Sequence, residues 1–344
     1  MRIGNMPIRF GKPRITAADV ARHAGVSQPT VSLVLSKHPH ARVAKATRER
    51  ILQAAQELGY RPNRLAQGLV HRRSFALGLL VPGFGNPVYA NIVSGAERVA
   101  ADEGYAVLLS EIDESNAARH VHTLIDRQVD GVIIAGIAAD TLPQQELSRL
   151  NVVLINQPSP ANRYSTVAGD SLAAGRLAAE HLLELEHERI AFIGPHTPLP
   201  AFRLRERGFV TRLRDAGVVP RSEYWQRADA TVAGGQSAMR RLLELPEPPT
   251  AVFCVTDVIA LGAHKAASKA GIRLGGELSL LGCDDIEMNT LVSPELSSIR
   301  TPQRELGALA VRQLIQQLHR EDAQPTTHIL PVKLIKRGTT KRKP

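Results

Sequence analysis

The stretch ITAADVARHAGVSQPTVSLVLSKHP, residues 15–39, predicts two short helices joined by a tight turn. Thr16 is a suitable N-cap for the first helix, and Asp19, three residues later, favours the positive end of the helix dipole. Gly25 permits the turn, because glycine adopts backbone conformations that other residues avoid. The first helix is expected to pack through a narrow apolar face formed by Ala17, Val20, Ala21 and Ala24.

The second helix has two different faces when successive residues are placed about 100° apart. Ser27 caps this helix, and Pro29 is tolerated in its first turn. The outer face is mostly polar and consists of Gln28, Pro29, Ser32, Leu33 and Ser36, whereas the opposite face consists of Val31, Val34 and Leu35. Such a helix can pack by its apolar face and enter a DNA major groove with the other. Any small amphipathic helical hairpin is the alternative.

Basic charge is concentrated in the same region. Residues 1–75 contain fourteen Lys and Arg against three Asp and Glu, a net charge of +11, whereas the whole chain carries +10. The remaining residues therefore carry a net charge of −1. This asymmetry is typical of a nucleic-acid-binding module, although charge alone does not indicate sequence specificity.

A third helix is expected from about Lys45 to Leu58, with Ile51, Leu52, Ala55 and Leu58 facing inward. It is followed by RPNRLAQGLVHRRS, residues 61–74, in which Leu65, Ala66, Leu69 and Val70 stand at helical spacing among basic residues. A segment that only joined two domains would not need an apolar side chain such as Leu69 there.

From Phe75 onward, apolar runs alternate with helical stretches. Near-continuous Val/Ile/Leu strands separated by helices predict an α/β fold with parallel sheets covered on both faces. Such sheets bind ligands beyond the carboxyl ends of their strands. The candidate ligand-binding residues at these positions are Phe84, Asn86, Tyr89, Asn156, Arg205, Thr256, Asp257 and Asp284. The alternative for several of them, Asp257 above all, is that they only cap helices.

The chain resembles the LacI/GalR family of bacterial transcriptional repressors. The resemblance rests on ADVARHAGVSQPTVSLVLS, on TRERILQAAQELGYRPNRLAQGL and on the layout of the remaining chain, and it covers nearly all of residues 15–335. It implies a helix-turn-helix domain, a hinge helix that folds on operator DNA, and two α/β lobes of the type I periplasmic-binding-protein fold. The lobes would bind a small effector between them.

The resemblance also implies specific contacts. Leu69 occupies the place of the hinge leucine that wedges between bases in the minor groove; the alternative is that it packs on the next domain. The DNA-contacting residues are expected to be Thr16, Ser27, Gln28, Pro29, Thr30, Ser32, Leu33, Ser36, Asn63, Arg64, Ala66 and Leu69. Leu33 departs from the Arg that many members carry, and Leu offers only apolar contact, for example to a thymine methyl. The operator sequence therefore cannot be copied from a relative.

The resemblance also implies which residues line the effector cleft. Tyr89, Asn156, Arg205, Thr256 and Asp284 match positions that line the cleft in relatives. Thr256 replaces the usual Asn, and Asn156 replaces an Asp, so the effector cannot be inherited by analogy. A sugar, a sugar acid or a similar metabolite is expected.

Five segments are expected. They are a basic tail (1–14), a helix-turn-helix domain (15–60), a hinge helix and linker (61–74), an effector-binding and dimerisation domain (75–335) and a solvated basic tail (336–344). Within the effector domain, lobe 1 is expected at about 75–169 and 300–323, and lobe 2 at about 170–299 and 324–335. The chain would cross between the lobes near 168–172, 298–302 and 322–328.

Other classes of function find little support. There is no phosphate loop, dinucleotide fingerprint or nucleophile elbow, so an enzyme, a cofactor and a metal are not expected. His181 and His187 are six residues apart and are expected on the surface, while Cys254 and Cys283 stand in apolar runs and are expected to be buried thiols. Without a membrane span or a signal peptide, a cytoplasmic protein is expected. The resemblance implies a homodimer, possibly a tetramer. The rival is a solute-binding protein of the same two-lobed fold.

Overall fold

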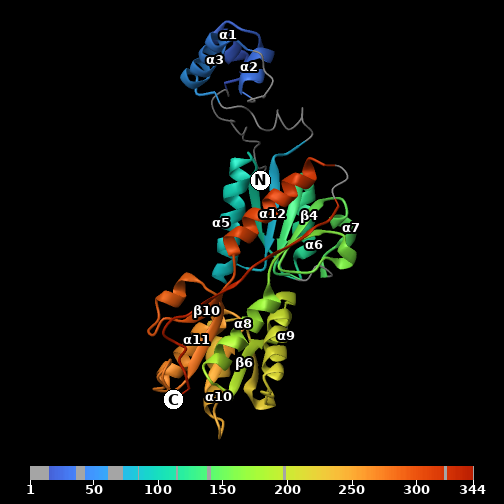
Figure 1. Ribbon diagram of the computed structural model, residues 1–344. Coiled ribbons are helices and arrows are strands. Elements are labelled where there is room, and N and C mark those ends of the chain that lie inside the picture. Colours follow the sequence, from blue (N-terminus) through green and yellow to red (C-terminus); the bar gives the residue numbers. More distant parts are fainter. Residues whose placement is uncertain are drawn as a thin grey trace, which may run out of the picture. The chain divides into compact units, whose positions relative to one another are not determined.

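The computed structural model of the chain describes residues 15–35, 43–60, 73–83, 85–113, 115–137, 141–196, 199–320 and 324–343. The chain divides into two compact units, Met1–Ser74 and Phe75–Pro344, each of which is described on its own. Figure 1 shows the elements of both units. Several predicted contact residues lie outside the described residues, namely Ser36, Asn63, Arg64, Ala66, Leu69 and Phe84.

The first unit contains α1 (Ala17–Ala24), α2 (Gln28–Leu35) and α3 (Lys45–Glu57). The three helices share one small core, whose buried side chains are Val20, Ala21, Ala24, Val31, Val34, Ile51, Ala54 and Ala55. The expectation that Leu52 faces inward was wrong, since this side chain is 49 % exposed. Ala54 is buried instead, because only a narrow strip of α3 meets the other two helices.

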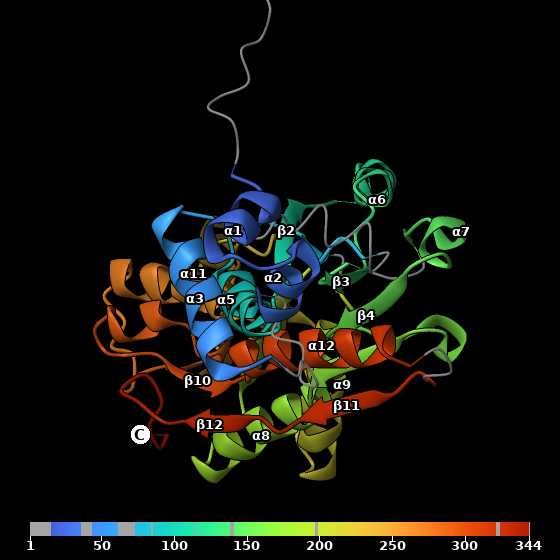
Figure 2. The same cartoon turned by 90° about the horizontal axis from the view of Figure 1, so that it is seen from above.

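The second unit has two lobes, each built on one six-stranded sheet. The sheet of lobe 1 has the order β11-β5-β4-β3-β1-β2 and is parallel throughout. Its strands are β1 (Ala76–Val81), β2 (Ala106–Glu111), β3 (Gly131–Ala135), β4 (Asn151–Ile155), β5 (Ser165–Gly169) and β11 (Thr327–Leu330). Its helices are α5 (Pro87–Asp102), α6 (Ala117–Asp126), α7 (Gln144–Leu147) and α12 (Gln303–Leu318). Figure 2 shows α6 and α7 on one side of β3 and β4, and α12 on the other.

Lobe 2 repeats this plan with the order β12-β10-β9-β8-β6-β7. Its strands are β6 (Ile190–Pro195), β7 (Trp225–Ala228), β8 (Ala251–Cys254), β9 (Ser279–Asp284), β10 (Ser297–Arg300) and β12 (Lys333–Ile335). Its helices are α8 (Ser171–Glu184), α9 (Pro200–Asp215), α10 (Val232–Leu243) and α11 (Asp257–Lys269). The predicted parallel arrangement holds except for β12, which is antiparallel to β10. Both cysteines are buried free thiols, as expected.

The chain crosses between the lobes after β5, after β10 and after β11. The third crossing lies at 331–332 and not in the predicted range of 322–328. The reason is that β11 pairs with β5 along its whole length, from Thr327 opposite Thr166 to Leu330 opposite Gly169. Residues 324–330 therefore belong to lobe 1, and only β12 returns to lobe 2.

The C-terminal tail is solvated only in part, which corrects a second expectation, because Thr339 and Thr340 pack against lobe 2 while Lys336, Lys341 and Arg342 stay exposed. Thr339 is fully buried, and its hydroxyl donates to the Leu280 carbonyl at 2.7 Å. The predicted surface histidines are buried as well, each 3 % exposed. His181 Nε2 lies 2.9 Å from the Thr340 hydroxyl, and His187 Nε2 lies 3.0 Å from the Lys341 carbonyl oxygen. The tail therefore covers these histidines, while the Lys336 and Arg342 side chains remain 64 % and 69 % exposed.

Candidate functional site

The outer face of α2 is one candidate site. Val31 and Val34 are buried against the other helices, whereas Gln28, Pro29, Ser32 and Leu33 are exposed. Leu33 is 40 % exposed. The two predicted faces are therefore confirmed. These four side chains of the outer face therefore lie outside the core of the unit.

The ends of α1 and α2 are fixed by local hydrogen bonds. The Asp19 amide donates to the Thr16 hydroxyl at 3.3 Å, and the Thr16 amide donates to the Asp19 carboxylate at 2.9 Å, which is a complete capping box. Hydrogen bonds from Thr16 lower the pKa of Asp19. Gly25 ends α1 with a φ of 63°, a conformation that favours glycine. The Ser27 and Thr30 hydroxyls lie 2.8 Å apart at the start of α2.

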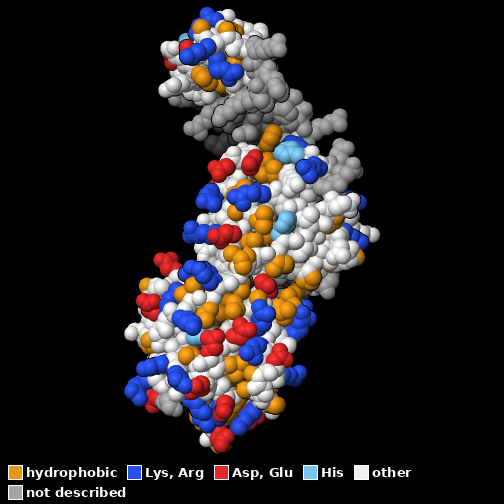
Figure 3. Space-filling view, in the orientation of Figure 1, with side chains coloured by type: hydrophobic (Ala, Val, Ile, Leu, Met, Phe, Trp, Pro, Cys, Tyr) orange, Lys and Arg blue, Asp and Glu red, His pale blue; other side chains and the backbone are white. Residues whose placement is uncertain are grey.

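Figure 3 shows Lys and Arg side chains gathered on the visible face of the first unit. Residues 15–35 and 43–60, which form the described helices of this unit, carry four Lys and Arg against three Asp and Glu, so most of the excess charge of residues 1–75 lies outside the described residues.

The second candidate site is the cleft between the two lobes. Arg205 of α9 and Asp284 at the end of β9 form a buried ion pair, with Arg205 Nη2 2.8 Å from Asp284 Oδ1. Arg205 Nη1 also donates to the Val255 carbonyl at 2.8 Å. Burial opposes the charge on Arg205, but Asp284 more than compensates and raises the pKa of the guanidinium. The site therefore holds an ion pair whose two groups have fixed positions.

Close helix packing positions Arg205. α8 and α9 contact each other through glycines, since a Cβ added to Gly175 would lie 1.8 Å from the Arg205 carbonyl oxygen. A Cβ on Gly208 would likewise lie 2.1 Å from the Leu172 carbonyl oxygen. No side chain larger than a hydrogen fits at either position, so the backbone of α9 is held directly against α8.

An inner chamber of about 30 Å³ lies beside this ion pair. Five of the predicted ligand residues line it together, namely Asn86, Tyr89, Asn156, Arg205 and Asp284. Burial, and then the charge of Asp284, raise the pKa of Tyr89, so the phenol stays protonated. A Cβ on Gly136 would lie 2.2 Å from the Tyr89 hydroxyl oxygen, so a larger residue at position 136 would collide with the Tyr89 side chain.

Two other predicted residues have structural roles and do not line the inner chamber. The Thr256 hydroxyl accepts from the Ile259 amide at 3.4 Å and caps α11. Asp257 is fully buried, and both its oxygens are occupied: Oδ1 accepts from Ser298, and Oδ2 accepts from the Ile286 amide and the Asn289 side chain. Asp257 therefore joins α11 to β10 and to the segment after β9. It does not cap α11, whose N-cap is Thr256, so the capping alternative holds for Thr256 and not for Asp257.

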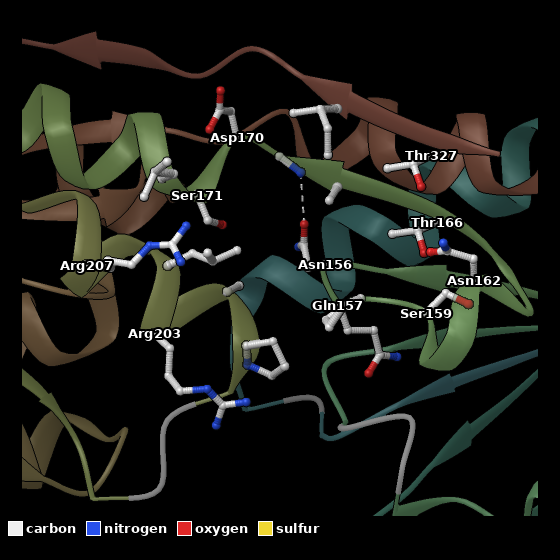
Figure 4. Close-up of a pocket in the computed structure, with 18 residues that line it drawn as sticks. Asn156, Gln157, Ser159, Asn162, Thr166, Asp170, Ser171, Arg203, Arg207 and Thr327 are labelled. Carbon is white, nitrogen blue, oxygen red and sulfur yellow. Dashed lines mark hydrogen bonds between the residues drawn. The ribbon is translucent and has the colours of Figure 1, made fainter.

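An outer chamber of about 760 Å³ adjoins the inner one and shares Asn156, Gln157, Pro200 and Ala201 with it. Figure 4 shows Arg203, Arg207 and Ser171 on one side of this chamber and Ser159, Asn162 and Thr166 on the other. The Asn156 side-chain oxygen accepts from the Gly169 amide at 3.0 Å, which ties the end of β4 to the first crossing. The two sides come from different lobes.

Sequence reasoning missed several residues of the cleft. Gln157 directly follows Asn156 after β4, so the rule that placed Asn156 at the site could have placed Gln157 there too. Gln303 Nε2 donates to the Asp284 carbonyl at 2.6 Å, and Thr166 and Thr327 reach the outer chamber from two paired strands. Nothing local in the sequence marks these three.

Across the ranges that the structure describes, no cluster of three or more His, Cys, Asp or Glu side chains could hold a metal ion. Nor does any helix within those ranges have the length and apolar character needed to cross a bilayer.

Comparison with known proteins connects both sites to one family. Residues 16–63 match the model for bacterial regulatory proteins of the lacI family, and residues 179–340 match that of a periplasmic binding protein-like domain. The chain is 33 % identical over 333 residues to the HTH-type transcriptional repressor CytR of Escherichia coli, covering 96 % of this chain and 97 % of that one.

Solved structures agree. The lac repressor dimer bound to operator and the anti-inducer ONPF superposes with a TM-score of 0.82 at 28 % identity, covering 96 % of this chain and 100 % of that one. A LacI family transcriptional regulator from Enterococcus faecium with bound ribose superposes with a TM-score of 0.72 at 26 % identity, covering 78 % of this chain and 99 % of that one. With a capped helix-turn-helix, two parallel-sheet lobes and a full-length repressor relative, the chain belongs to the LacI family of bacterial transcriptional regulators.

Proposed function

We propose that the chain is a homodimeric transcriptional repressor that binds a palindromic operator and is controlled by a small sugar-like metabolite between its lobes. The observation that carries the proposal is the exposed outer face of α2, in a basic unit joined to a two-lobed unit with a polar cleft. The operator-bound dimer and the ribose complex among its structural relatives support the same assignment.

On this proposal, α2 reads base edges in the major groove. Gln28 and Ser32 supply hydrogen bonds, and the exposed Leu33 makes apolar contact with a thymine methyl. Thr16, Ser27 and Thr30 lie at the exposed helix starts and contact phosphates. The predicted hinge contacts of Asn63, Arg64, Ala66 and Leu69 belong to the same proposal.

The effector contacts proposed for the cleft are those of Asn86, Tyr89, Asn156, Arg205 and Asp284, of which Asn156 lines both chambers. Their chemistry, two amides, a phenol and a fixed ion pair, suits a ligand rich in hydroxyl groups. A sugar that bound both lobes would change the spacing between them, and DNA affinity would then respond through linkage.

The test is selection of genomic DNA fragments by the full chain, followed by measurement of the affinity for the selected site. Leu33→Ala should weaken binding to that site by about tenfold while leaving non-specific binding unchanged. Leu52→Ala is the matched control, because Leu52 is also an exposed leucine of the same unit but lies on α3.

Failure to select any palindromic site would overturn the proposal and favour a solute-binding protein without a DNA function. Equal losses for Leu33→Ala and Leu52→Ala would leave DNA binding in place but remove α2 as the reading helix.

A further inference from the structure

The lobe 1 side of the outer chamber holds two buried polar atoms that no described residue satisfies. Gln157 is 3 % exposed and Thr166 is 4 % exposed, and both line the chamber. Gln157 Oε1 and Thr166 Oγ1 have no hydrogen-bond partner among the described residues. Gln157 Nε2 donates to the Ile134 carbonyl at 3.3 Å, which leaves the amide oxygen as the free end. Buried polar atoms without partners are costly, so their position in a cavity wall points to a ligand.

The lobe 2 side of the chamber is positive. Arg203 and Arg207 line it, and α8 and α9 both begin there. No side chain caps the N-terminus of α9, a helix of sixteen residues. Pro200 has no amide hydrogen, and the Phe202 and Arg203 amides donate to the Leu199 carbonyl, so this helix start offers an anion the Ala201 amide and the positive end of the helix dipole. Arg207 is exposed and forms no ion pair or hydrogen bond with any described residue. In Figure 4 its guanidinium extends into the chamber beside Ser171.

One acidic side chain also lines the chamber, but it is engaged elsewhere. The Asp170 carboxylate accepts from the Ala173 amide at 2.8 Å and caps α8. Two arginines against this one carboxylate leave the lining with a net positive charge. The uncapped start of α9 and the unpaired Arg207 therefore favour a negatively charged ligand group at the lobe 2 side of the chamber.

We propose that the outer chamber binds an anionic sugar derivative. Its phosphate or carboxylate would lie between Arg207 and the start of α9, and its hydroxyl groups would satisfy Gln157 and Thr166. This inference rests on the proposed function, because it names the class of metabolite that controls the protein.

The size of the cleft supports this placement. The outer chamber, at about 760 Å³, falls in the range of ordinary ligand pockets of roughly 300–1,000 Å³. The inner chamber, at about 30 Å³, has room for little more than a water molecule. A neutral sugar would leave Arg207 unpaired, and inorganic phosphate alone would leave Gln157 and Thr166 unpaired. A sugar that carries a phosphate or carboxylate supplies an anion for Arg207 and hydroxyl groups for Gln157 and Thr166.

The experiment is titration calorimetry of the full chain with two series of probes. One series is ribose, ribose 5-phosphate and ribonate, and the other is glucose, glucose 6-phosphate and gluconate. In at least one series an anionic member should bind about tenfold more tightly than its neutral parent, the effect of one charge-assisted contact. The phosphate and acid arms show which anionic group is preferred.

Three variants locate the binding. Arg207→Gln should abolish the preference for the anionic member over its parent. Arg214→Gln, an exposed arginine two turns further along α9 and outside the chamber, should leave the preference intact. Thr166→Val keeps the β-branched shape in β5 and removes the hydroxyl, so it should weaken the anionic and neutral members by a similar factor, about three- to tenfold.

The inference is overturned if no member of either series binds, if charge brings no gain in affinity, or if Arg207→Gln behaves as Arg214→Gln does. It is equally overturned if Thr166→Val binds as the parent protein does. DNA selection by the same preparations separates the two hypotheses. Intact DNA selection with a failed sugar test removes only this inference, whereas failed DNA selection removes the proposed function.

Discussion

Replacing Arg205 by Met should destabilise lobe 2, because it breaks a buried ion pair from one side. Arg205 and Asp284 side chains are 5 % and 4 % exposed, and their charged atoms lie 2.8 Å apart. Without Arg205, the nearest remaining side-chain donor to Asp284 Oδ1 is the Thr301 hydroxyl, at 3.5 Å. Stranding a buried charge in this way costs about 3–5 kcal/mol. The free energy of unfolding of Arg205→Met should fall by that amount at neutral pH.

The double variant tests the reason for the loss. Asp284→Asn removes the negative charge and keeps an oxygen acceptor near Arg205. If the destabilisation comes from a stranded charge, Arg205→Met combined with Asp284→Asn should lose less than the sum of the single losses. The difference should be about 1–3 kcal/mol, the usual coupling between side chains in direct contact.

Urea unfolding of the full chain, followed by far-UV circular dichroism, measures all four proteins of this cycle. The matched control is the cycle for Arg273 and Glu277, whose side chains are 81 % and 49 % exposed at a separation of 3.2 Å. That exposed pair should show no measurable coupling. Additive losses at Arg205 and Asp284, or the same coupling in both cycles, would refute the reasoning.

Three other predictions follow from single features. Burial, and then the charge of Asp284, raise the pKa of Asp257 from 3.8 to about 7, so the folded state holds a proton that the unfolded chain releases. Stability should therefore fall as pH rises from about 4 to 7, and Asp257→Asn should flatten this slope in urea melts at several pH values; parallel profiles would contradict it. Truncation after Arg337 removes Thr339, which bonds Leu280 and Ser297, and should lower Tm by several degrees in calorimetry, about 2–4 °C per kcal/mol. Operator affinity should decrease with salt with a log–log slope of about −0.9 per phosphate contacted, and a flat titration would exclude the electrostatic role of the +11 region.

The sequence by itself determined the elements whose stability comes from neighbouring residues. The capping box of Thr16 and Asp19 and the turn at Gly25 rely on hydrogen bonds and backbone freedom within a few residues. The two faces of α2 follow from helical periodicity alone, and the structure buries Val31 and Val34 as that periodicity requires. The parallel sheets were likewise predictable, because their strands are continuous apolar runs separated by helices.

The tertiary structure decided everything that depends on distant contacts. His187 bonds the Lys341 carbonyl 154 residues away, so the backbone of a basic tail covers a histidine that looks solvated in the sequence. Pairing of β11 with β5 moves the third crossing, and no local signal in Thr327–Leu330 specifies which sheet it joins. Gln157 and Thr166 come within one chamber with Arg207 only because two lobes face each other there. Periodicity and capping act within one element, whereas burial and pairing depend on which elements meet.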